Sequence, residues 1–189
     1  MRNTLLLILL ASATTSLQGC FPVVAGGAGA GVLMAEDRRS AGTFVEDQGI
    51  ELKASNRLDE KFQDRVHVNV TSYNRNVLMT GEAPTEALKQ EVETTVRGVP
   101  SVRQVLNEVV VASPTSFASR SNDTLLTSKV KARFLDIGKF QANHVKVVSE
   151  NGAVYLLGLV KRNEANDAVE IARTTDGVQK VVKVFEYID

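Results

Sequence analysis

The chain has little of what a disulfide-rich, metal-binding or redox protein usually contains. Its 189 residues include one cysteine, two histidines and no tryptophan. A single cysteine excludes an intramolecular disulfide, so any folded domain must be stable through its core alone. His67 and His144 have no cysteine or further histidine beside them at the spacing of a metal site. We therefore expect both histidines to be structural, and we predict no metal and no cofactor.

The balance of charge excludes a class of partner. The 22 basic residues equal the 22 acidic ones, so no net field attracts nucleic acid. No Gly-x-Ser-x-Gly sequence and no Ser/His/Asp set occurs in a context that would suggest nucleophilic catalysis. The carboxylates of the predicted helices lie on faces where solvation is the default. We predict that the protein is not an enzyme and has no catalytic residue.

Long apolar runs are also absent, and the one near the N-terminus has the length of an export signal. Arg2 gives a positive start, and residues 5–11 are too few to span a bilayer. The sequence Leu17-Gln18-Gly19-Cys20 resembles a bacterial lipoprotein signal, in which the cysteine is acylated and becomes the mature N-terminus. We expect residues 1–19 to be the signal peptide and Cys20 to be the lipidation site. An ordinary secreted protein with a chance cysteine is the alternative.

The residues after Cys20 predict a location and a tether. Phe21, rather than aspartate, follows the cysteine, and the sorting rule of enteric-type bacteria then favours the outer membrane, with the domains facing the periplasm. Residues 20–45 are rich in Gly and Ala, most of all residues 26–31, and this composition indicates a flexible spacer. A phosphate-binding loop would need a preceding strand and a Gly-Lys-Ser/Thr sequence, and neither is present.

An internal repeat organises the rest of the chain. Residues 67–70 (HVNV) align with residues 144–147 (HVKV), and the same offset aligns Val77 with Val154. The match resumes at a Gly-Val pair before the last apolar run of each copy. The repeated glycines are predicted to be structural: Gly81, Gly98, Gly158 and Gly177.

Each copy has the pattern α-β-β-α-β. In the first copy the elements are expected over residues 48–62, 66–73, 77–81, 84–97 and 102–111. In the second copy the first helix is expected over residues 121–137, a hairpin turn at Asn151-Gly152 and the second helix over residues 162–175. This predicts an α+β fold of two tandem units, each with a small three-stranded mixed sheet packed against two helices. The units are expected to cover residues 46–112 and 121–189, with a linker over residues 113–120.

One strand of the second copy differs from a half-buried strand. Residues 154–157 (VYLL) are apolar at successive positions, whereas a strand with one solvated face alternates. We expect this strand to be covered on both faces, which indicates an interface between the two units.

The α-β-β-α-β order, the strand-ending glycines and the Gly-Val before the last strand resemble the BON-domain family. Two such units behind a lipoprotein signal and a Gly/Ala tether are similar to outer-membrane lipoproteins of that family, and the resemblance covers almost the whole chain, including residues 121–124 (SNDT) and 150–152 (ENG). It implies a role in outer-membrane integrity and at the division site. It also implies binding of anionic phospholipids (phosphatidylglycerol, cardiolipin) by the first helix of the second domain, and association with the outer-membrane protein assembly machinery.

The predicted helix over residues 121–137 carries more apolar surface than one core needs. Asn122 or Asp123 can cap it. Leu125 and Leu135 fall opposite the core stripe, where a purely structural helix is expected to be polar. The core stripe is expected to consist of Leu126, Val130, Phe134 and Ile137.

Alignment of the two first helices provides an internal control. Gly49 stands where Leu125 is, and Asp59 stands where Leu135 is, whereas Lys129 and Arg133 have basic counterparts in the first copy. The shared cations can therefore reflect solubility of the fold, and the two outward leucines distinguish the second copy. Relatives can carry tryptophan in place of Leu125, so contact here is expected to be shallower. The residues predicted to contact phospholipid are Leu125, Ser128, Lys129, Lys131, Ala132, Arg133 and Leu135.

Three hypotheses compete with lipid contact at this helix. The leucines could instead pack against the first copy or against Phe117. The chain could also be an adaptor for the assembly machinery or for cell-wall hydrolase regulation, or a periplasmic stress protein with holdase activity.

Overall fold

The computed structural model describes residues 37–113 and 117–189, with only the backbone for residues 117–119. The predicted signal peptide, the lipidation site Cys20 and most of the predicted tether lie outside the described residues.

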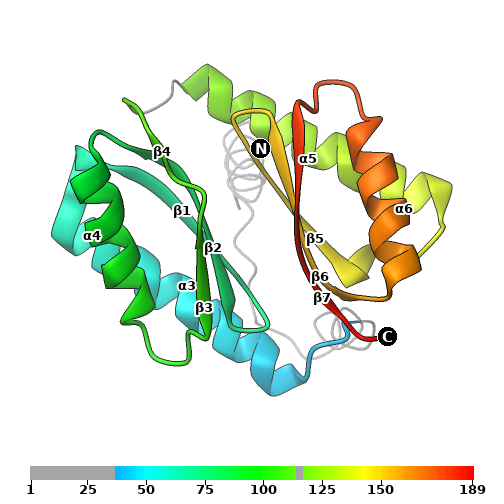
Figure 1. The fold of residues 1–189 in the computed structure, drawn as a ribbon, viewed down its shortest axis with the longest axis horizontal. Helices are drawn as coiled ribbons and strands as arrows, with labels where there is room; N and C mark the ends of the chain where they lie inside the picture. Colours follow the sequence, from blue (N-terminus) through cyan, green and yellow to red (C-terminus); the bar gives the residue numbers. More distant parts are fainter. Residues whose placement is uncertain (1–36, 114–116) are drawn as a thin grey trace, which may run out of the picture. The chain divides into compact units, whose positions relative to one another are not determined.

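The first repeat has two helices on one face of a mixed sheet (Figure 1). Strand β1 pairs antiparallel with β2, and β3 and β4 both pair parallel with β2. A break at Glu108 and Val109 divides the last strand into β3 and β4. The elements are α3 (Ala41–Phe62), η2 (Gln63–Arg65), β1 (His67–Tyr73), β2 (Asn76–Ala83), α4 (Glu86–Arg97), β3 (Gln104–Asn107) and β4 (Val110–Val111).

The second repeat has the same order with an unbroken last strand. Strand β5 pairs antiparallel with β6, and β7 pairs parallel with β6. The elements are α5 (Phe117–Ile137), η3 (Ala142–His144), β5 (Val145–Glu150), β6 (Ala153–Val160), α6 (Arg162–Arg173) and β7 (Lys180–Tyr187). The α+β prediction of two tandem α-β-β-α-β units is confirmed.

Each repeat has its own core between its helices and its sheet. In the first repeat Ile50, Ala54 and Leu58 of α3 pack against Val77 and Met79 of β2. The second core is built in the same way, and its members include Leu126, Val130, Phe134, Val154 and Leu156. The i, i+4, i+8 stripe of each first helix therefore faces its own sheet, as the periodicity predicts.

A third apolar cluster joins the other faces of the two sheets. Tyr73 and Leu78 of the first repeat pack with Tyr155 and Leu157 of the second. Residues of β6 alternate between this cluster and the second core, so the strand is covered on both faces. The interface expected from residues 154–157 is thus confirmed, and both repeats belong to one compact unit.

Both first helices begin earlier than expected. Helix α3 starts at Ala41 because Ser40 caps it and accepts a hydrogen bond from the Thr43 N–H. Helix α5 starts at Phe117, so part of the predicted linker is helical, and Asn122 and Asp123 lie inside the helix rather than at its cap. Residues 41–45 and 117–120, which were assigned to the tether and the linker, are therefore helical.

The end of α5 also corrects the predicted core stripe. Ile137 is 40% exposed, because the helix ends there and Gly138 turns the chain with a φ of 63°. Phe140 takes the place expected for Ile137, since its ring packs edge-on against Phe134 with centroids 5.0 Å apart.

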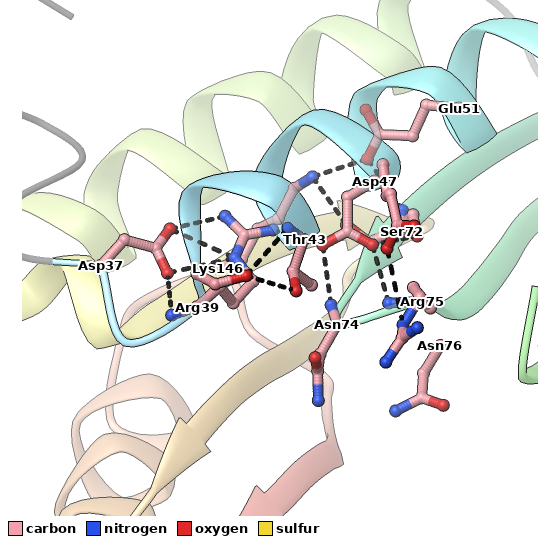
Figure 2. A network of polar contacts seen from close by, with 12 residues as sticks. Asp37, Arg39, Thr43, Asp47, Glu51, Ser72, Asn74, Arg75, Asn76 and Lys146 are labelled. Carbon is pink, nitrogen blue, oxygen red and sulfur yellow. Dashed lines mark hydrogen bonds and ion pairs between the residues drawn. The ribbon is translucent and has the colours of Figure 1, made fainter. Parts of the chain in front are cut away.

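An aspartate from each first helix holds the following hairpin turn. The buried Asp47 carboxylate accepts from the N–H groups of Asn74 (2.8 Å) and Arg75 (2.7 Å) (Figure 2). Asp123 accepts from the N–H groups of Asn151 (2.9 Å) and Gly152 (3.0 Å). These bonds satisfy N–H groups that the turns leave unpaired, which is why Asp123 does not serve as a helix cap.

The predicted structural glycines have different environments. A Cβ at Gly81 would lie 2.1 Å from the His67 oxygen of β1, and a Cβ at Gly158 would lie 2.4 Å from the His144 oxygen just before β5, so neither position has room for a side chain. Gly177 has a φ of 96°, which favours glycine. Gly98 departs from the prediction, because its φ is −76° and a Cβ there would make only ordinary contacts.

Candidate lipid-contact surface

The outer face of α5 is a strip of exposed side chains with a leucine at each end. Leu125 is 61% exposed and Leu135 is 72% exposed, and Ser128 and Ala132 between them are also exposed. Their spacing of i, i+3, i+7 and i+10 places them on one side of the helix, and the leucines are roughly 15 Å apart along its axis. We call Leu125, Ser128, Ala132 and Leu135 the α5 outer face. Both leucines therefore have most of their side-chain surface available in the described part of the fold.

Arg133 is engaged elsewhere in the fold. Its guanidinium donates to the Ile171 carbonyl at 2.9 Å and to the hydroxyls of Thr174 and Thr175. Those groups form the C-terminal end of α6, where carbonyls lack helical partners and a cation is favourable. Arg57 of the first repeat donates to the Gly98 carbonyl at 2.8 Å in the same way. This shared arginine therefore ties the two helices of each repeat together.

The remaining charges at the outer half of α5 are mixed. Lys129 lies 3.5 Å from Asp176, and both side chains are largely in solvent. Lys131 is exposed, and within residues 37–113 and 117–189 it forms no ion pair. Asp136, beside Leu135, is also exposed. The sequence alignment of the two helices did not identify this acidic residue, because it compared only the leucine positions and their basic neighbours. The local charge is thus only weakly positive.

Exposed apolar residues are not confined to the second repeat. Val45 and Leu52 of α3 are 62% and 63% exposed. They lie seven residues apart on one side of α3. The alignment did not reveal them because Leu52 corresponds to Ser128, not to Leu125 or Leu135. The two helices therefore differ in where the exposed apolar side chains stand, which are positions 125 and 135 in α5 and positions 45 and 52 in α3, and not in having them.

Amide and carboxylate side chains link the repeats at the rim of the shared cluster. Asn69 donates to Glu150 at 2.9 Å, and Asn151 donates to the fully buried Glu82 at 2.7 Å. Lys146 of β5 reaches Glu51 of α3 at 2.7 Å (Figure 2). Burial, with the nearby carboxylates of Glu108 and Glu150, raises the pKa of Tyr155 to about 12. In each of the three hydrogen-bonded pairs, one residue belongs to the first repeat and the other to the second.

The residues just before α3 contact both repeats. Arg38 donates to both carboxylate oxygens of Glu164, at 2.6 and 2.7 Å, and to the Leu159 carbonyl at 2.9 Å. Arg39 donates to Asp47 at 2.8 Å, and its guanidinium lies 4.1 Å from the centre of the Tyr73 ring. The hydrogen bonds from Arg38 hold the pKa of Glu164 at about 2, below its usual range. No local sequence pattern predicts these contacts, because the partners lie far apart in the chain.

His144 lies beside the Arg38–Glu164 pair. Burial, with the nearby Arg38 guanidinium, lowers the pKa of His144, whose ring lies 3.6 Å from Glu164. In the described ranges no group of three or more Cys, His, Asp or Glu side chains is arranged to hold a metal ion. None of the helices within those ranges is long and apolar enough to cross a bilayer.

Comparison with known proteins places the chain in a family. The BON domain model matches residues 46–113 and again residues 122–189. The chain is similar to the outer membrane lipoprotein DolP of Haemophilus influenzae, with 40% identity over 97% of this chain and 96% of that protein. It is also similar to the 21 kDa hemolysin of Actinobacillus pleuropneumoniae (34% identity, 80% of this chain and 79% of that protein) and to the osmotically-inducible protein Y of Escherichia coli (29%, 80% and 78%). The two repeats with their separate cores are therefore two BON domains, and the chain belongs to the BON-domain family as a DolP-like member.

Proposed function

We propose that this chain is a non-enzymatic, lipid-anchored outer-membrane protein whose α5 outer face contacts anionic phospholipid on the periplasmic side. The observation that carries the proposal is the exposure of Leu125 and Leu135 at the two ends of one helix face. The similarity to a protein named outer membrane lipoprotein supports the location. Phosphatidylglycerol and cardiolipin are the proposed lipids.

The energy of such a contact is small. Full burial of one exposed leucine yields roughly 1.5–3 kcal/mol, and partial insertion yields less. A lysine near an anionic surface adds about 1 kcal/mol. The sum corresponds to contact in roughly the millimolar range, which is too weak for attachment.

Attachment is proposed to come from acyl chains on Cys20. A protein already held at the bilayer meets it at high effective concentration, so that a weak site becomes occupied. Cys20 would thus keep the protein at the membrane, and the α5 outer face would determine which lipids it prefers. That preference supports the proposed role in outer-membrane integrity and at the division site.

The leucines dominate the contact and the charges adjust it. Lys131 and Lys129 attract an anionic surface, whereas Asp136 opposes it. Arg133 is assigned to the end of α6 rather than to lipid, because its guanidinium already has three acceptors there. The proposed contact set is therefore the α5 outer face with Lys129 and Lys131.

Vesicle flotation tests the proposal. A soluble form lacking residues 1–20 is mixed with phosphatidylglycerol vesicles or with neutral vesicles. We expect preferential flotation with the anionic vesicles and a loss of roughly tenfold or more for Leu125→Glu, since the substitution removes apolar burial and adds a like charge. The thermal midpoint is expected to stay unchanged because the side chain is exposed.

Leu52→Glu provides the matched control, because Leu52 is a leucine of nearly equal exposure on the first helix of the other repeat. Its flotation is expected to equal that of the unmodified protein. Equal losses for the two variants would contradict a specific role of α5. No flotation with either lipid, together with capture of an assembly-machinery component that Leu125→Glu abolishes, would favour the adaptor function instead.

A further inference from the structure

Residues 37–40 connect the predicted membrane tether to both BON domains. The side chain of Arg38 reaches α6 and β6 of the second domain, although the next residues begin α3 of the first domain. The Arg38 and Glu164 side chains are 22% and 12% exposed, so the bidentate pair is largely shielded from solvent. A bidentate Arg–carboxylate pair of this kind fixes orientation as well as distance.

Arg39 holds the same residues to the first domain. Its side chain is 6% exposed and donates to the fully buried Asp47, which also holds the β1–β2 turn (Figure 2). The guanidinium stacks on Tyr73, a member of the cluster that joins the two sheets. Arg39 also pairs with Asp37 at 2.6 Å, so removal of Asp47 would leave the guanidinium with one carboxylate instead of two. Removal of Arg39 would leave the fully buried Asp47 carboxylate without its cation, which is strongly unfavourable.

We propose that residues 37–40 form a strap that fastens the start of α3 to both domains and places the attachment point of the preceding residues beside the C-terminal end of α5. The strap thereby determines which side of the two domains is nearest to the lipid anchor. Without it, residues 37–40 would add to the length of free chain between Cys20 and α3.

The position of the strap explains why the anchor and α5 would act together. Arg38 lines a hollow of about 550 Å³ with Leu135, Phe140, His144 and Glu164. Leu135 is thus next to the place where the described chain begins. For a spacer as flexible as its composition predicts, the root-mean-square distance from Cys20 to Arg38 is roughly 20–25 Å, so an attachment point held by the strap favours positions in which this end of α5 is close to the bilayer. This consequence rests on the proposed lipid contact, whereas the strap itself does not.

Trypsin tests the strap in the full lipidated protein reconstituted in vesicles. Cleavage after Arg39 requires its buried side chain to leave Asp47, and it releases a fragment that begins at Ser40. We expect slow release from the unmodified protein and at least about tenfold faster release from Arg38→Ala, since loss of one anchor raises the population of the open strap. The new N-terminus is identified by mass spectrometry.

Two further variants keep this test decisive. Glu164→Gln removes the partner charge but retains an oxygen that can accept the Lys161 N–H, and it should also speed release. Arg173→Ala breaks the exposed Arg173–Glu170 pair of α6 and should leave the release rate unchanged. Circular dichroism establishes that each variant is folded. Equal release from the unmodified, Arg38→Ala and Glu164→Gln proteins would overturn the strap.

A fluorescent reporter tests the orientation. The chain contains no tryptophan, so Leu135→Trp introduces a single one, and brominated phosphatidylglycerol quenches it on contact. We expect quenching in the lipidated protein and at least a twofold decrease when Arg38→Ala is added. Unchanged quenching with faster tryptic release would overturn the orienting role. No quenching in either protein would contradict the proposed lipid contact. The rate of tryptic release would then be the test of the strap.

Discussion

The first helices of the two BON domains share their inner faces and differ on their outer faces. Ile50, Ala54 and Leu58 of α3 correspond to Leu126, Val130 and Phe134 of α5, and both sets are buried. Outside, α3 has Gly49 and Asp59 where α5 has Leu125 and Leu135. Core packing constrains only the inner stripe, so the outer face is where one fold can acquire a second role.

The comparison also distinguishes charged side chains that have a partner within the fold from those that are exposed to solvent or lipid. Asp47 and Asp123 hold equivalent turns, and Arg57 and Arg133 hold equivalent helix ends. A charge that has the same partner in both domains is accounted for by the fold. Lys131, whose counterpart is Ser55, has no such explanation and is left for solvent or lipid.

The largest expected effect concerns the turn aspartates. Asp47→Ala should lower the free energy of unfolding by about 3–5 kcal/mol, because it removes one of the two carboxylates paired with the buried Arg39 and the acceptor of two turn N–H groups. Asp123→Ala should cost about 1–3 kcal/mol, since it leaves only turn N–H groups without a partner. Urea unfolding measures both values. Equal costs would show that Arg39 contributes nothing and would weaken the strap.

Arg57 and Arg133, at the helix ends, should differ less in their contribution to the free energy of unfolding. Here the larger cost is expected in the second domain. Arg133→Met should cost about 1–3 kcal/mol because three acceptors at the end of α6 lose a charged donor, whereas Arg57→Met should cost about 0.5–1.5 kcal/mol because one exposed carbonyl is affected. Thermal unfolding with matched protein concentrations measures both. A loss of vesicle flotation by Arg133→Met at unchanged stability would return this residue to the lipid-contact set.

Transfer of the leucines to the first domain tests whether they are sufficient. Gly49→Leu with Asp59→Leu should increase flotation with phosphatidylglycerol vesicles severalfold, because it adds apolar area on the outside of α3. A Cβ at Gly49 meets no atom within 4 Å, and replacing a helical glycine stabilises the helix, so the thermal midpoint should not fall. Unchanged flotation would mean that α5 contributes something beyond its leucines.

The smallest expected effect is on charge. Asp136→Asn should strengthen binding to anionic vesicles by up to about fivefold, which corresponds to removal of about 1 kcal/mol of repulsion, and should leave neutral vesicles unaffected. Titrated co-sedimentation in low and high salt measures the change. Equal gains with both vesicle types would indicate that hydration of the carboxylate, rather than its charge, limits insertion.

Much of the fold followed from patterns close together in the chain. The repeated HVNV and HVKV segments and the alternating strands predicted two α-β-β-α-β units, and residues 154–157 predicted a strand covered on both faces. The outward direction of Leu125 and Leu135 followed from helical periodicity. The predicted ends of the helices were less accurate. Ser40, for example, is compatible both with a polar tether and with a helix cap, so the sequence does not show where α3 begins.

The sequence by itself determined the repeat, the two cores and the unusual outer face of α5, because each depends on periodicity along one helix or strand. Only the tertiary structure decided how the charges are distributed. Asp123 was predicted to cap a helix and Arg133 to contact phospholipid, but Asp123 accepts from the Asn151-Gly152 turn and Arg133 donates to the end of α6. Arg38 and Glu164 are separated by 126 positions, and a pair so distant leaves no local pattern. The partners of buried charges depend on which distant segments come together in the folded protein, whereas periodicity reports only the structure of one segment.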